Sequence, residues 1–145
     1  MYSRKQVKIF LSFLLFGVLL GLVENLLAIH FATDHALSLR VVGISVLVVI
    51  PFAALGELIV DRKPLIPHAN NVFLRRLEVF LEFFVFGMVM GVVEDLIVIK
   101  LVTGASLTWE VVGIVALVVF PFAVLGELIV DRSDWFSWLT KWVSY

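Results

Sequence analysis

One stretch of this chain occurs twice. VVGISVLVVIPFAALGELIVDR, residues 41–62, returns as VVGIVALVVFPFAVLGELIVDR, residues 111–132, with 18 of 22 positions identical and no gap. Upstream, FGVLLGLVEN (residues 16–25) matches FGMVMGVVED (residues 86–95) at the same offset of 70 residues. This self-similarity indicates a tandem duplication of one structural unit, which covers most of the 145 residues.

The composition is typical of a membrane protein. Hydrophobic residues make up 62% of the chain and charged residues 16%, whereas soluble domains have roughly 45–50% and 25%. Four apolar runs reach the ~20 residues that a helix needs to cross a bilayer. They lie near Ile9–Phe31, Val41–Val60, Val79–Leu101 and Val111–Val130. We therefore predict an all-α integral membrane protein with four transmembrane helices.

The duplication predicts how these helices are organised. Each repeat holds two helices joined as a hairpin, so both repeats insert the same way up and are related by a pseudo-two-fold axis along the membrane normal. The expected units are a first repeat (1–62), a linker (63–71), a second repeat (72–132) and a Trp-rich tail (133–145). We expect the tail to form a short interfacial helix; a docking surface for a partner is the alternative.

The charges indicate an orientation. Nine Lys and Arg residues lie in the N-terminal segment, the linker region and the tail, whereas only Arg40 and Lys100 lie on the opposite side. By the positive-inside rule, both termini and the linker are predicted to be cytoplasmic. A net charge of −1 gives no reason to expect nucleic acid as a partner. The absence of cysteine excludes disulfides and thiolate metal sites.

Each repeat carries one glutamate deep in its first helix, on the same face as two glycines. Gly17, Gly21 and Glu24 fall at i, i+4 and i+7, which places them on one helix face. Small residues spaced by four allow two helix backbones to approach closely in lipid, so we expect this face to be a packing seam. The second repeat has the same pattern in Gly87, Gly91 and Glu94.

The depth of these glutamates makes them candidate functional residues. Glu24 lies about 24 Å along the helix from Lys8, at 1.5 Å per residue. A charged side chain at the bilayer centre costs about 2.5–3.5 kcal/mol on insertion scales, so the carboxyl groups must be protonated, paired or hydrated. Tight structural pairing and an ion site are both open interpretations. Gly43 and Gly113 are expected at the same level on the second helices, leaving room for water, an ion or a close backbone.

A second acidic set lies near the predicted cytoplasmic ends of the second helices. Glu57 and Asp61 are one turn apart, and the repeat has Glu127 and Asp131. Like charges at this spacing repel unless a cation or a basic side chain intervenes. We interpret the set as a cation-attracting mouth; local pairing at the headgroups is the alternative.

Pro51 and Pro121 lie within the second helices. Each removes one backbone hydrogen bond and clashes with the preceding turn, which predicts a kink. The kink either leaves carbonyls free to meet an ion or only shapes helix packing.

Arg40 and Glu110 occupy equivalent positions with opposite charge, and we predict that they pair across the pseudo-two-fold axis. Reversing the charge of Arg40 should lower stability by about 0.2–1 kcal/mol, and reversing Glu110 in the same protein should restore it. Thermal unfolding of the two single variants and the double variant measures this coupling. Additive effects would exclude the pair.

The sequence contains no nucleophile–base arrangement, phosphate-binding loop or dense His cluster, so we expect neither an enzyme nor a bound metal or cofactor. The favoured function is a small channel or transporter subunit, homo-oligomeric or joined to other membrane subunits. It would move a cation or proton through the membrane-embedded glutamates. The alternative is a non-catalytic structural or assembly subunit of a larger membrane complex.

Overall fold

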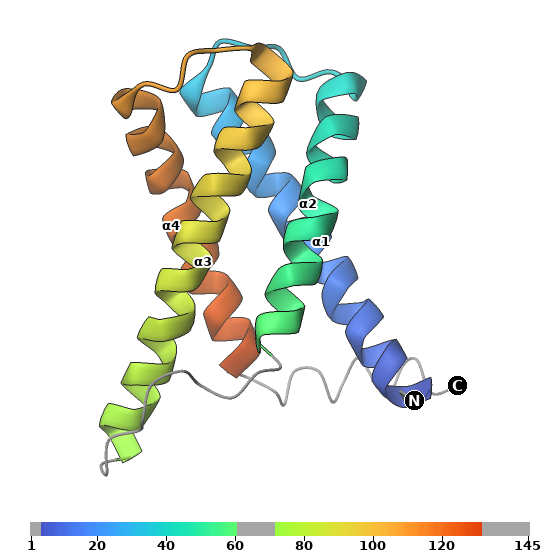
Figure 1. The fold of residues 1–145 in the computed structure, drawn as a ribbon, viewed down its shortest axis with the longest axis vertical. Helices are drawn as coiled ribbons and strands as arrows, with labels where there is room; N and C mark the ends of the chain where they lie inside the picture. Colours follow the sequence, from blue (N-terminus) through green and yellow to red (C-terminus); the bar gives the residue numbers. More distant parts are fainter. Residues whose placement is uncertain (1–3, 61–71, 132–145) are drawn as a thin grey trace.

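A computed structural model describes residues 4–60 and 72–131, apart from some side chains near the helix ends. These residues form four α-helices: α1 (Arg4–Ala32), α2 (Leu39–Val60), α3 (Val72–Thr103) and α4 (Trp109–Asp131). As Figure 1 shows, α1 and α3 run in one direction, and α2 and α4 return beside them. The all-α prediction is confirmed for the part of the chain that is described.

Three of these helices are long and apolar enough to cross a membrane: Phe10–Ala32 in α1, Leu39–Gly56 in α2 and Trp109–Gly126 in α4. The prediction of membrane-spanning helices is confirmed at this level. The helix α3 has 32 residues, but its apolar stretch also contains charged side chains, which set it apart. They are Glu82, Glu94, Asp95 and Lys100.

The two hairpin turns use equivalent polar side chains to satisfy backbone groups. The hydroxyls of Thr33 and Thr103 each donate to a carbonyl four residues earlier, at 2.7 Å. Ser38 and Thr108 precede α2 and α4, and each hydroxyl oxygen accepts from a backbone N–H three residues later. Gly104 has φ +66°, a conformation that favours glycine. Local sequence therefore fixes where the helices end and begin.

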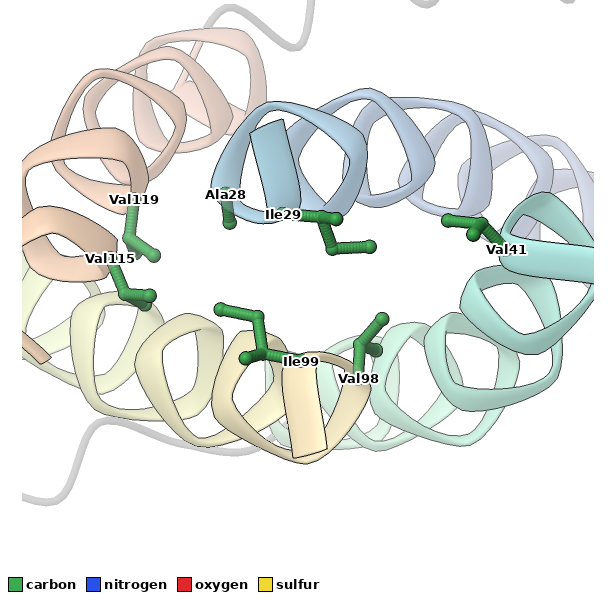
Figure 2. Close-up of a cluster of buried hydrophobic side chains, with 7 residues drawn as sticks. All are labelled: Ala28, Ile29, Val41, Val98, Ile99, Val115 and Val119. Atoms are coloured by element: carbon green, nitrogen blue, oxygen red, sulfur yellow. The ribbon is translucent and has the colours of Figure 1, made fainter. Parts of the chain in front are cut away.

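The bundle interior near these turns is apolar. Seven aliphatic side chains, called here the apolar cluster, come from all four helices and point into the space between them (Figure 2). Equivalent positions of the two halves are buried, such as Ile29 and Ile99. The members of the cluster are Ala28, Ile29, Val41, Val98, Ile99, Val115 and Val119.

The outer surface of the bundle carries large apolar side chains. Leu47 and Leu117 are 72% and 76% exposed, and Trp109 is 89% exposed. Contiguous apolar surface of this kind is stable against lipid or other membrane helices and not against water. The outer surface thus agrees with the apolar character of the helices.

The two prolines lie on this outer surface. Pro51 and Pro121 are inside helices that continue across them, and both are exposed. Leu47 and Leu117, four residues earlier, are also exposed. The positions whose carbonyls lose a donor therefore lie on the outer face, away from the interior of the bundle. The kink itself stays a prediction.

Candidate functional site

The glycines of the first repeat lie where α1 meets α2. A Cβ added to Gly17 would be 3.4 Å from Ala53 Cβ, and one added to Gly21 would be 3.1 Å from Val49 Cγ1. Both distances are at or inside ordinary van der Waals contact, so the absence of a side chain allows this approach. Hydrogen is the only substituent that fits without a shift at Gly21.

The second repeat has the same contacts between α3 and α4. A Cβ on Gly87 would lie 3.7 Å from Ala123 Cβ, and one on Gly91 would lie 2.7 Å from Val119 Cγ1. By contrast, a Cβ on Gly43 or Gly113 would meet no atom within 4 Å. Among the described residues, these last two glycines do not form a close helix contact.

Each deep glutamate lies over the glycine of the other repeat. Glu24 Oε1, from α1, is 2.9 Å from the position that a Cβ on Gly91 would take. Reciprocally, Glu94 Oε1, from α3, is 3.6 Å from the Cβ position on Gly21. Glycine therefore has two roles here: it brings the helices of one hairpin together and leaves space for the carboxyl group of the other.

Two further buried polar residues follow these glutamates in sequence. Asn25 is 0% exposed and donates from Nδ2 to Glu94 Oε1 at 3.0 Å. Asp95 is 1% exposed, and the carboxyl groups of Glu24 and Glu94 lie near enough to repel a negative charge on its own carboxyl group. We call Glu24, Asn25, Glu94 and Asp95 the carboxyl cluster. It brings three carboxyl groups and one amide together in the middle of the bundle.

The carboxyl cluster has no basic partner among the described residues. No ion pair joins Glu24, Glu94 or Asp95 to a basic side chain in that part of the chain. The buried atoms Asn25 Oδ1, Asp95 Oδ2 and Ser45 Oγ have no hydrogen-bond partner there. Buried polar atoms in proteins nearly always have a partner, whether protein, water or ligand, so such a set indicates a place where another group binds.

Lys100, on the same helix as Glu94 and Asp95, is used elsewhere. Its Nζ donates to the carbonyl oxygens of Gly104 and Ala105 at 3.3 and 3.2 Å. The ammonium group therefore contacts the α3–α4 turn and leaves the carboxyl cluster without a compensating charge from this lysine.

A cavity of about 260 Å³ adjoins the two glutamates and is lined by residues of all four helices. It lies between the glutamates and the N-terminal parts of α1 and α3, which diverge in Figure 1. Beyond the glutamates, toward the helix turns, lies the apolar cluster. Six phenylalanines from three pairs of equivalent positions line the cavity: Phe13, Phe16, Phe52, Phe83, Phe86 and Phe122.

Several predicted site residues are not brought to this cavity or fall outside the described residues. Arg40 and Glu110 are exposed in the first turns of α2 and α4, and no ion pair joins them within the described ranges; their pairing stays a prediction. Among the described residues, no three His, Cys, Asp or Glu side chains are placed so that together they could hold a metal ion. Asp61 and the side chains of Glu57, Glu127 and Asp131 lie outside the description, as does the tail 133–145.

Asn25 and Asp95 were not predicted from the sequence as site residues. Their signal was available, since a polar or ionisable residue within an apolar span is a functional candidate by default. The phenylalanine lining was also missed. Phe13 and Phe16 continue the face of Gly17, Gly21 and Glu24 at helical spacing, but only the structure shows that this face borders a cavity.

Comparison with protein-family models, curated proteins and solved structures finds no match to this chain. The carboxyl cluster and the cavity are therefore the features from which a function is inferred.

The close approach at Gly91 gives a test of the site geometry. We expect Gly91→Ala to destabilise the protein by roughly 1–3 kcal/mol, because the new methyl group overlaps both Val119 and the Glu24 carboxyl. Gly113→Ala is the matched control, with open space at the same type of helical position. It should be neutral or stabilising, by up to about 1 kcal/mol from helix propensity. Thermal unfolding, monitored by circular dichroism, compares the two variants. Equal midpoint temperatures of unfolding would contradict the close contacts at Gly91.

Proposed function

We propose that this protein is a small channel or transporter subunit that moves a cation or a proton, with Glu24 and Glu94 as its binding site. The observation that carries the proposal is the position of the two carboxyl groups, at the end of a cavity and without a basic partner among the described residues. Asn25 orients Glu94 through its hydrogen bond.

Electrostatics favours a cation in this place. The attraction between unit charges at 4 Å is about 1 kcal/mol in water and about 4 kcal/mol at an effective dielectric constant of 20. Two nearby carboxylates repel each other by the same physics. A bound cation or proton relieves this repulsion, and the same group can leave by way of the cavity. Binding and release at one site are what transport requires.

The apolar cluster would act as the barrier to a hydrated ion. Its seven aliphatic side chains lie beyond the glutamates and offer no polar atom to a hydrated ion. Hydrophobic constrictions of this kind prevent conduction by excluding water. We infer that the cavity gives access from one side, and that passage requires the apolar cluster to separate.

The proposal includes four membrane spans, with α3 as the fourth. Two of its charged residues, the half-buried Glu94 and the buried Asp95, belong to the carboxyl cluster and would not face lipid. The two hairpins would be parallel-oriented repeats about an axis along the membrane normal. The positive-inside rule would place the termini, the linker and the open side of the cavity at the cytoplasm. The Trp-rich tail would lie in the headgroup region.

The assembly-subunit alternative requires a basic group from another polypeptide to neutralise the carboxyl cluster. A helix has a diameter of about 10–12 Å with its side chains, so a partner helix would have to separate the four helices to enter. The cavity of about 260 Å³ instead has room for a small ion or molecule, and not for a helix. Stoichiometric co-purification with a basic membrane partner would nevertheless support the alternative.

The central test replaces both glutamates. Glu24→Gln with Glu94→Gln removes the negative charges but retains similar side-chain volume, so the protein should still fold. Its cation flux should fall at least about tenfold. Proton, sodium and potassium flux into liposomes, each measured with an ion-sensitive dye, provides the readout. Glu110→Gln, an exposed site in the first turn of α4, should retain the flux. Unchanged flux in the double variant would remove Glu24 and Glu94 from the mechanism.

A further inference from the structure

We propose that the cargo of this site is a hydrophobic organic cation, whose charge is carried by a quaternary or aromatic nitrogen on a body of one or two rings. The inference rests on the proposed function, because the same two glutamates supply the counter-charge. It goes further by naming the chemical class that the cavity recognises.

The polar groups of the cavity wall are few and gathered at one end. Among the described residues, Glu24 and Glu94 are the only ones that line the cavity with polar side chains; the others are aromatic, aliphatic, methionine or glycine. A metal cation such as Ca²⁺ takes 6–8 oxygen ligands, and dehydrated monovalent ions require rings of oxygen atoms. A wall with two carboxyl groups and no hydroxyl or amide side chain does not provide such a shell. An organic cation with a diffuse charge needs no directional donors.

The phenylalanines supply the second part of the recognition. Six rings line the cavity, in pairs from the two repeats. The negative face of an aromatic ring attracts cations, and aromatic cages are the known means by which proteins bind quaternary ammonium groups. Pockets for organic ligands are mostly apolar, with a few placed polar groups. An apolar chamber with a charged end fits a molecule that has an apolar body and one positive charge.

The volume limits the size of this molecule. A cavity of roughly 150 Å³ accommodates benzene, so a cavity of about 260 Å³ has room for one or two rings with a small cationic head. Benzyltrimethylammonium matches these requirements. Neopentylbenzene is its neutral isostere, because a quaternary carbon replaces the quaternary nitrogen, and tetramethylammonium has the charge but no ring.

The test is equilibrium dialysis of radiolabelled benzyltrimethylammonium against the full-length protein in nanodiscs, with empty nanodiscs as the baseline. We expect saturable binding of the labelled compound. Neopentylbenzene and tetramethylammonium should displace it at least about tenfold less well than unlabelled benzyltrimethylammonium does. Glu24→Gln with Glu94→Gln should abolish the preference for the charged compound. Phe52→Leu with Phe122→Leu should weaken binding about tenfold. Phe120→Leu, which is exposed and outside the cavity, should leave binding unchanged.

Two results would overturn the inference. The first is the absence of saturable binding to the intact protein, and the second is binding that the double glutamine variant retains. If inorganic cation or proton flux still depends on Glu24 and Glu94 in either case, the proposed function stands and only the class of cargo is wrong. If that flux is also independent of the glutamates, both proposals fail.

Discussion

The burial of carboxyl groups inside an apolar bundle is the constraint on which the rest of this structure depends. Glu24 and Glu94 each lie against a glycine of the other repeat, among apolar residues where an ionised group is costly, and the surrounding residues accommodate them. Gly21 and Gly91 lack the atoms that would occupy the place of the opposite carboxyl. Asn25 donates the one hydrogen bond that the described residues give to the pair. No basic side chain among the described residues compensates the two carboxyl groups, and this is the observation that supports the proposed cation.

Both repeats contribute residues to the carboxyl cluster, and the two contributions differ. Glu94 accepts a hydrogen bond from Asn25, whereas the equivalent neighbour on the other side is Asp95, which presents a carboxyl group in place of an amide. Asp95 is as deeply buried as Asn25. The two glutamates therefore have unequal surroundings, and a symmetric pair of repeats provides an asymmetric site.

The sequence predicted those features that follow from periodicity and hydropathy. Apolar runs of about 20 residues predicted the helices, and the i, i+4, i+7 spacing placed Gly17, Gly21 and Glu24 on one face. It could not predict which helix each face meets. Gly21 approaches Val49 of its own hairpin and also Glu94 of the other, a three-way contact that depends on how the hairpins pack. Gly43 and Gly113, expected to leave room at the level of the glutamates, have no atom within 4 Å of an added Cβ. The phenylalanine cavity was not foreseen, because it too depends on how the hairpins pack.

The proposed mechanism requires that the glutamates can be reached from one side of the membrane only, and cysteine labelling tests this most directly. The chain contains no cysteine, so a single Ala53→Cys substitution in the cavity wall reports without interference in oriented membranes. We expect a membrane-impermeant thiol reagent to label this position only from the side on which α1 and α3 begin. Val115→Cys, within the apolar cluster, should stay unlabelled from both sides. Ala36→Cys, exposed in the α1–α2 turn, is the control that reacts from the other side. Absence of labelling at position 53 from either side would mean that the helices pack here without water, and would contradict access to the glutamates through the cavity.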